Sequence, residues 1–233
     1  MGKILFTSDL HCEKGLRTQI CTSFLDYIEK YCLDNGINDI VFGGDILNKS
    51  SSIKNETFLP LFLRLMDMKK NNLNLYFILG NHDIFNKDND SIALTFSSFG
   101  TVIKKNTTLN IAGYGYDLLS YIEKEEELME QKSQTLLTHL PIMSFYYDNG
   151  YGDDNICFTP ELFSSYDLVV TGHFHKYQHK GNILYPGAPY QLTFGEQGHD
   201  KCFAIVEGTN FELIPYDEAP TFLTIKIEDF KKY

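Results

Sequence analysis

Hydrophobic residues follow two different periods in the first third of the chain. Short apolar runs at 3–7, 40–42 and 75–79 predict three buried strands. Between these runs, apolar side chains recur in steps of three and four over residues 17–35 and again from Phe58 onward, which predicts two amphipathic helices. The alternation of strand and helix predicts an α/β fold with a parallel sheet and right-handed crossovers.

The rest of the chain is richer in strands. Its apolar runs predict eight further strands, at 101–104, 108–112, 135–138, 167–171, 182–185, 202–206, 211–214 and 222–227. Residues 123–132 are expected to form a charged, exposed helix. The segment 141–157 has no clear period and is either a functional loop or merely a mobile one; its length in a compact domain favours a functional loop.

The composition is that of a single globular domain covering residues 1–233. Hydrophobic residues make up 43% and charged residues 22% of the 233 positions, which excludes disordered, collagen-like and low-complexity proteins. No apolar run approaches the ~18 residues of a membrane span, so no membrane association is expected. The five cysteines form no C-x-x-C pair, which favours reduced thiols and a cytoplasmic location.

Polar residues of metal-binding types stand directly after predicted strands. They are Asp9 and His11, then Asp45, then Asn81, His82 and Asp83, then His139, and finally His173 and His175. Taken one at a time, such residues are more often parts of turns or buried, hydrogen-bonded histidines. In an open α/β sheet, however, the carboxyl ends of the strands form the ligand crevice. Five strand ends of this kind in one chain therefore predict a metal site.

The ligand types favour two adjacent divalent cations. One carboxylate can bridge two metals, and Asp45 is the natural candidate because it stands alone on its strand end. Mixed histidine, aspartate and asparagine ligands suit Mn²⁺, Fe²⁺ or Zn²⁺. No cysteine lies among them, which argues against a structural zinc site. Two metals ~3.5–4 Å apart can hold a bridging hydroxide as nucleophile and clamp both oxygens of an in-line phosphoryl displacement.

Taken in order, these motifs resemble those of the calcineurin-like metallophosphoesterases. They are Asp-x-His, Gly-Asp, Gly-Asn-His-Asp, a later histidine and Gly-His-x-His, and the resemblance runs from about residue 3 to residue 227. It implies a four-layer α-β-β-α sandwich around two sheets. The ligands that it implies for one metal are Asp9, His11, Asp45 and His175. Those that it implies for a second metal are Asp45, Asn81, His139 and His173.

The resemblance also assigns roles around the leaving group. His82 matches the family's catalytic histidine, which acts as general acid to the leaving oxygen or steadies the transition-state charge. Asp83, next to it, is expected to orient His82. Asn48 stands where nuclease members of the family usually have histidine or aspartate, and it is expected to hydrogen-bond a substrate phosphate or a water molecule.

Two segments resemble the DNA double-strand-break nucleases of the SbcD type and their phage counterparts. One is Tyr-Pro-Gly-Ala-Pro-Tyr at 185–190 followed by Phe-Gly-Glu at 194–196, and the other is the tail at 219–225. Protein phosphatases of the superfamily instead carry an arginine shortly after Gly-Asp, and residues 46–49 contain none. The resemblance implies DNA as substrate, an SMC-like ABC ATPase of the SbcC type as partner, and a homodimer. It implies Mn²⁺ as the metal, with Mg²⁺, Fe²⁺ and Zn²⁺ as alternatives.

Two features depart from the nuclease pattern. The cap that grips DNA and the tail that binds the ATPase are expected to be absent from residues 1–233. The net charge is −11, and such a surface repels nucleic acid at long range. Two bound cations would add positive charge where a phosphate must dock.

Three hypotheses about function follow. The first is a Mn²⁺-dependent DNA exonuclease or endonuclease subunit of a recombination or repair complex. The second is a small phosphodiesterase or phosphatase for nucleotides or other small phosphoesters, which the acidic charge and the missing cap favour. The third is a non-enzymatic scaffold with the same fold. Such scaffolds typically lose ligands or the catalytic histidine, and here every position is filled.

Overall fold

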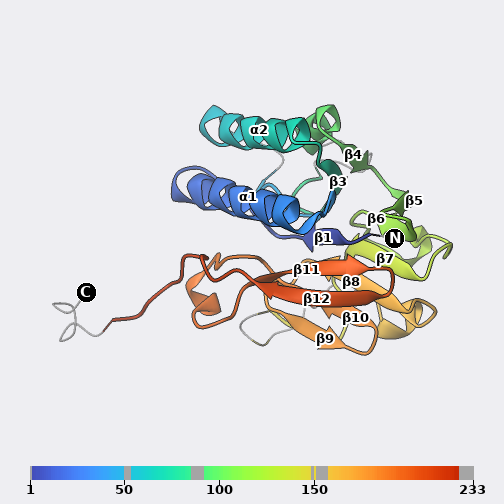
Figure 1. Cartoon of the computed structure of the whole chain (residues 1–233). Coiled ribbons are helices and arrows are strands. Elements are labelled where there is room, and N and C mark those ends of the chain that lie inside the picture. The colour runs from blue at the N-terminus through green and yellow to red at the C-terminus, as the bar shows by residue number, and fades with distance from the viewer. Residues whose placement is uncertain (1, 50–53, 85–91, 148–149, 151–156, 226–233) are drawn as a thin grey trace.

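The computed structural model describes residues 2–49, 54–84, 92–147, 150 and 157–225, which form two six-stranded sheets packed against each other (Figure 1). The strand order of the first sheet is β12 (Asn210–Pro215), β11 (Cys202–Glu207), β1 (Ile4–Thr7), β2 (Asp39–Gly43), β3 (Asn74–Ile78) and β4 (Thr101–Ile103). That of the second is β5 (Asn106–Ile111), β6 (Tyr114–Leu119), β7 (Thr135–His139), β8 (Leu168–Gly172), β10 (Ile183–Tyr185) and β9 (Gln178–Lys180). The predicted α/β architecture with two sheets is confirmed.

Parallel strands dominate both sheets, with antiparallel strands at one margin of the first sheet and at both margins of the second. Strands β1 to β4 run parallel, as do β6, β7, β8 and β10, whereas β11, β12, β5 and β9 pair in the antiparallel sense. The carboxyl ends of β2 and β7 meet across the two sheets, because the His139 ring donates from Nδ1 to the Gly43 carbonyl at 2.8 Å. The loops after the parallel strands of both sheets therefore converge on one region.

Two helices, α1 (Leu16–Asn35) and α2 (Asn55–Lys70), lie side by side over the first sheet (Figure 1). Phe24, Ile28 and Cys32 recur at helical spacing and bury one face of α1 on the sheet. The helix ends at Gly36, whose φ of 66° is the left-handed conformation that closes many helices. No helix within the described ranges is long and apolar enough to cross a membrane.

Three hydrophobic clusters separate four layers. The first cluster lies between the helices and the first sheet, and the second fills the space between the sheets with side chains such as Phe6, Val41 and Leu137. The third covers the outer face of the second sheet. Among the described residues this fourth layer contains no α-helix: loops and short 3₁₀ turns such as η2 (Glu125–Glu127) and η3 (Pro160–Phe163) take its place.

The helix expected over 123–132 is wrong. The segment forms only the single turn η2, and all residues from Glu123 to Glu127 are exposed. Only Leu128 and Met129 of this segment pack against the third cluster, and so small an apolar contact does not offset the cost of nucleating a helix. The charged pattern therefore describes a solvated loop.

The strand expected over 222–227 is wrong in its described part, 222–225. There Phe222 donates its backbone N–H to the Gln191 side chain at 2.7 Å, and the Thr224 hydroxyl donates to the Gln197 side chain at 2.7 Å. These contacts to glutamine side chains take the place of the backbone hydrogen bonds that a strand at the edge of a sheet would make. Residues 226 and 227 lie outside the described residues.

Strand β6 is absent from the sequence-based prediction. Its sequence contains Asp117, a residue that usually interrupts a strand pattern. Asp117 is nevertheless fully buried, and its carboxylate accepts hydrogen bonds from Thr108, Tyr166 and the backbone of Lys132. These hydrogen bonds, from residues distant in the sequence, offset the cost of desolvating the Asp117 carboxylate. The local sequence alone would predict that this aspartate lies at the surface.

Candidate metal centre

The loops after the strands hold four of the expected ligands in strained backbone conformations. Asp9, His11, Asp45 and His173 have φ angles of 58°, 42°, 53° and 102°. This region is uncommon for residues other than glycine, and each instance costs about 1–3 kcal/mol. Only seven non-glycine residues in the described ranges have a positive φ, so the strain is concentrated here. Such strain persists where the surrounding structure enforces it, which is typical of functional sites.

Backbone hydrogen bonds align the loop after β1 with the loop after β2. The N–H of Asp9 donates to the Gly44 carbonyl at 2.9 Å, and the N–H of His11 donates to the Asp45 carbonyl at 2.9 Å. The two parallel strands therefore continue their pairing beyond the sheet. This pairing brings the side chains of Asp9, His11 and Asp45 to one place.

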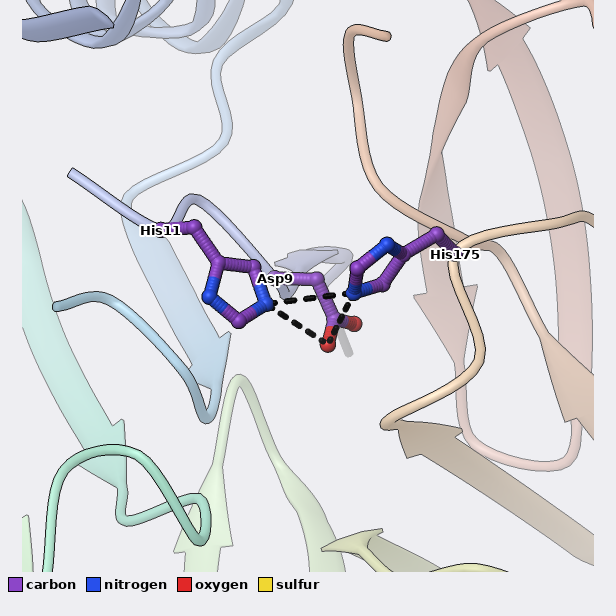
Figure 2. A group of neighbouring side chains, drawn as sticks. All are labelled: Asp9, His11 and His175. Atoms are coloured by element: carbon purple, nitrogen blue, oxygen red, sulfur yellow. Dashed lines mark hydrogen bonds and ion pairs between the residues drawn. The ribbon is translucent and has the colours of Figure 1, made fainter. Parts of the chain in front are cut away.

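The first ligand group consists of Asp9, His11 and His175, whose polar atoms point toward one another (Figure 2). The Nε2 atoms of His11 and His175 lie 3.1 Å apart, and Asp9 Oδ1 lies 3.9 Å from each of them. Asp45 Oδ2 is 3.6 Å from His11 Nε2. Donor atoms of Asp9, His11 and His175 thus lie within 4.8 Å of one another, and Asp45 Oδ2 is a further donor atom beside His11.

The second group, expected for the other metal, shares Asp45 with the first. Asp45 Oδ2 is 3.4 Å from His139 Nε2, and Asn81 Oδ1 is 3.2 Å from His173 Nδ1. The rings of His139 and His173 lie with centroids 5.6 Å apart. Because Nδ1 of His139 donates to the Gly43 carbonyl, Nε2 is the ring nitrogen that could bind a cation once it has lost its proton.

Asp45 is shared between the two groups through a single oxygen. Its Oδ2 lies 3.6 Å from His11 Nε2 and 3.4 Å from His139 Nε2. Its other oxygen, Oδ1, accepts the backbone N–H of His82 at 2.9 Å and is thereby fixed. This is the geometry that a bridging carboxylate needs.

Glycines allow the loops to approach this closely. A Cβ atom on Gly80 would lie 2.1 Å from Asp45 Oδ1. A Cβ atom on Gly44, which has a φ of 96°, would lie 2.4 Å from His139 Nδ1. Both contacts are too short for any side chain, so glycine is required before Asp45 and before Asn81.

Burial and neighbouring charges set the protonation of the site. Burial lowers the pKa of His11 to about 4, so its imidazole is neutral and has a free lone pair. Burial also disfavours a charge on His139, but the Asp45 carboxylate outweighs it and raises the pKa of His139 to about 9. Burial likewise opposes the charge on Asp45, yet His139 and His11 hold the pKa of this carboxyl well below its usual range. A bound divalent cation would take the place of the proton on His139 and would stabilise the Asp45 carboxylate in the same way.

The residues present fit divalent cations. His139 Nε2 is fully buried and has no hydrogen-bond partner among the described residues, which is costly unless another group satisfies it. Three overlapping groups hold donor atoms within 4.8 Å of one another: Asp9 with His11 and His175, His11 with Asp45 and His82, and Asp9 with Asp45 and His139. Imidazole, carboxylate and amide donors together suit Mn²⁺, Fe²⁺ or Zn²⁺.

A buried ion pair lies behind His175, and sequence patterns do not assign it to the site. Glu196 is fully buried, with Oε1 3.4 Å from His175 Nδ1 and Oε2 2.5 Å from Lys201 Nζ. Burial opposes its charge, but His175 and Lys201 lower the pKa of Glu196 to about 2. A carboxylate at Nδ1 orients a histidine so that Nε2 faces a metal. The Phe-Gly-Glu sequence at 194–196 is the signal that could have identified it.

We expect Glu196→Gln to weaken Mn²⁺ binding by roughly 10–100-fold, the usual effect of losing the carboxylate partner of a metal-ligating histidine. Calorimetric titration of metal-free protein measures this affinity, and thermal unfolding of the same samples shows whether the variant is folded. The exposed Glu161 offers a matched control, Glu161→Gln, that leaves the affinity unchanged. An unaltered affinity in folded Glu196→Gln protein would contradict the orienting role.

His82 is held at the edge of the centre by the backbone. Its Nδ1 lies 2.8 Å from the Asn48 carbonyl, and its ring packs edge-on against His11 with centroids 4.8 Å apart. Asp83 makes no hydrogen bond to the His82 ring among the described residues. Its buried carboxylate instead accepts the backbone N–H groups of Leu47 and Gly80, each at 3.0 Å. Asp83 therefore fixes the two loops that carry Asp45 and His82, and acts on His82 only through them.

Burial, with the nearby charge of Asp45, raises the pKa of Asp83 to about 7, and its backbone hydrogen bonds only partly offset this. Asn48 contributes its backbone carbonyl to His82, and its side chain is half-buried. Asn48 therefore contacts the catalytic candidate His82 through its backbone, which a residue of any type could do, and not through its amide side chain.

The segment 141–157 reaches the second ligand group in its described part. The Tyr147 hydroxyl lies 3.0 Å from His173 Nε2, which leaves Nδ1 of that ring facing Asn81. This contact fits the expectation that the segment is functional. Residues 148–149 and 151–156 lie outside the described residues.

Known proteins match the chain in sequence and in fold. A family model described as "Calcineurin-like phosphoesterase" matches residues 2–177. Exonuclease subunit 1 of Enterobacteria phage T4 is 26% identical over 199 residues, which cover 80% of this chain and 58% of that protein. The DNA double-strand break repair protein Mre11 of Nanoarchaeum equitans (strain Kin4-M) is 23% identical over 275 residues, covering 97% of this chain and 71% of that protein.

Among solved structures, a dimetal phosphatase from Danio rerio matches with a TM-score of 0.54 and 11% identity, over 92% of this chain and 99% of that one. At this identity the likeness concerns the fold alone. The chain spans less than two thirds of the phage exonuclease subunit's length.

Proposed function

Because the chain belongs to the calcineurin-like phosphoesterase family, we propose that it is a DNA nuclease that uses two adjacent divalent cations. Family membership makes it a metal-dependent phosphoesterase, a hydrolase of ester bonds. The proposal of two cations rests on the position of Asp45 Oδ2. This atom lies 3.6 Å from His11 Nε2 and 3.4 Å from His139 Nε2, so it can serve both ligand groups. Two adjacent cations are the arrangement that suits an in-line displacement at phosphorus.

We assign each cation to one ligand group. The first would be held by Asp9, His11, Asp45 and His175. The second would be held by Asp45, Asn81, His139 and His173. Mn²⁺ is proposed over Mg²⁺ because histidine nitrogens contribute to both groups. When bound, the cations polarise the phosphoryl oxygens and make water a competent nucleophile at neutral pH.

His82 is proposed to protonate the leaving oxygen. Its backbone N–H is tied to Asp45 Oδ1 at 2.9 Å and its Nδ1 to the Asn48 carbonyl at 2.8 Å, so the ring is fixed beside both ligand groups. With Nδ1–H donating to a carbonyl, Nε2 is the atom left to carry a proton to the substrate. Asp83 is a positioning residue, because it fixes the loops on either side.

Two observations favour DNA over a phosphoprotein or small ester. The relatives named as an exonuclease subunit and a double-strand break repair protein match 80% and 97% of this chain. Residues 46–49 after Asp45 contain no arginine to clamp a phosphomonoester. By the same likeness we propose an SbcC-type ABC ATPase as partner and self-association as a dimer.

One observation favours the alternative, a small phosphodiesterase. The net charge of −11 opposes long-range attraction of a polyanion, whereas a nucleotide with one or two phosphates suffers less repulsion. Both proposals use the same metal centre, and they differ in whether the surface around it binds a DNA strand or a small phosphoester.

The experiment compares single-stranded DNA, double-stranded DNA, a mononucleotide ester and bis-p-nitrophenyl phosphate, each with Mn²⁺, Mg²⁺ or Zn²⁺. We expect hydrolysis of both DNA and the synthetic diester with Mn²⁺, with single strands and ends cleaved faster than intact duplex. Addition of the ABC ATPase should speed duplex cleavage. If the mononucleotide ester is hydrolysed far faster than any DNA and the ATPase changes nothing, the nuclease proposal fails and the small phosphodiesterase replaces it.

A further inference from the structure

A hollow of about 290 Å³ opens beside the metal centre, and three lysines line it. We name it the lysine hollow. Its lining includes Lys14, Lys49 and Lys54 together with Cys12, Asn48 and Thr57.

The lysine hollow shares its walls with the metal centre. Cys12 directly follows His11, and the N–H of Asn48 donates to the Cys12 carbonyl at 3.2 Å. The Asn48 carbonyl in turn meets Nδ1 of His82 at 2.8 Å. The loops that carry His11 and Asp45 therefore form one side of the hollow, which lies next to His82.

The charge of the hollow is opposite to that of the chain. Its three lysines are exposed, and none of them has an ion-pair partner in the part of the chain that the structure describes. Glu13, the acidic residue in the lining, is paired with Arg17 at 3.2 Å. In a protein with a net charge of −11, this is a local concentration of positive charge next to the proposed active site.

We propose that the lysine hollow binds a second phosphate of the substrate, the one next along the strand from the phosphate at the cations. The inference rests on the proposed function and deepens it, since it defines the substrate as a strand with at least two phosphates. Lysine ammonium groups bind phosphate as point charges with three donors each. The first turn of α2 supplies Thr57 to the same wall.

The test uses the Mn²⁺-loaded protein with a triple variant, Lys14→Ala, Lys49→Ala and Lys54→Ala. A control triple variant removes three exposed lysines elsewhere: Lys30→Ala, Lys105→Ala and Lys132→Ala. Both change the net charge equally. The readout is competitive inhibition of bis-p-nitrophenyl phosphate hydrolysis by thymidine oligonucleotides with one phosphate and with three phosphates. The ratio of the two inhibition constants measures what the additional phosphates contribute.

We expect parent and control protein to bind the three-phosphate strand at least about 10-fold more tightly than the one-phosphate strand, and the hollow variant to lose most of this gain. The salt dependence of binding should weaken too, by ~0.7 in log–log slope for each phosphate of a single strand that the lysines no longer neutralise. Equal ratios in the hollow variant and the control variant would overturn the proposal.

The outcome separates this proposal from the nuclease proposal. Lysine-dependent inhibition without DNA cleavage supports the hollow and contradicts the nuclease. DNA cleavage that is equally fast in both variants supports the nuclease and contradicts the hollow.

Discussion

Replacing Asp45 by asparagine is expected to remove most of the activity and to weaken binding at both metal positions. One oxygen of this carboxylate lies within 3.6 Å of His11 Nε2 and 3.4 Å of His139 Nε2, so a single charge serves both ligand groups. Asparagine has nearly the same shape and can still accept the His82 N–H, but it lacks the charge. We expect turnover to fall by about 10³-fold or more, since bound metals supply several kcal/mol and each 1.4 kcal/mol is a factor of ten.

Metal content of purified Asp45→Asn and parent protein checks the expectation. Elemental analysis after dialysis gives the number of metals per chain, and turnover of bis-p-nitrophenyl phosphate gives the activity. Asp34→Asn, on the exposed face of α1, is the matched control that keeps both. If the Asp45→Asn protein retained two tightly held metals, the bridging assignment would be wrong.

Most of the site could be predicted from the sequence because it follows from the geometry of parallel strands. Carboxyl ends of neighbouring parallel strands meet at one edge, so polar residues after each strand converge whatever their separation along the chain. His11 and His175 are 164 residues apart and still come within 3.1 Å. The glycines before Asp45 and Asn81 also indicate in the sequence that these loops approach one another closely, since only glycine fits at those two positions.

The parts that escaped prediction depend on contacts that no local pattern encodes. Glu196 lies in a short turn and becomes part of the site only because the fold places its buried carboxylate between His175 and Lys201. Adjacency along the chain pairs Asp83 with His82, but the Asp83 carboxylate turns toward backbone N–H groups instead. Conversely, the acidic segment at 123–132 has the composition of a helix, but all side chains from Glu123 to Glu127 are exposed and only Leu128 and Met129 pack against the third hydrophobic cluster.

The role of His82 leads to a prediction that differs from that for Asp45. His82→Asn is expected to keep both metals and the affinity for substrate, and to lower turnover by roughly 10²–10⁴-fold, the usual contribution of a general acid. The exposed His179 gives a matched control, His179→Asn, with unchanged turnover. Since His82 lies in one donor group with His11 and Asp45, metal content must be measured on the same samples. Loss of a metal in His82→Asn would identify His82 as a ligand instead of an acid.

The leaving group then distinguishes proton donation from electrostatic positioning. A good leaving group such as p-nitrophenolate needs little protonation, so His82→Asn should slow hydrolysis of a nitrophenyl diester far less than that of an alkyl or nucleoside diester. A plot of log turnover against leaving-group pKa should be nearly flat for the parent and steep for the variant, because only the parent donates a proton as the bond breaks. The Asn48 carbonyl at Nδ1 fixes the ring in the orientation that this transfer requires. Equal losses for all leaving groups would contradict the acid role, and would mean that His82 acts by stabilising charge on the phosphoryl oxygens.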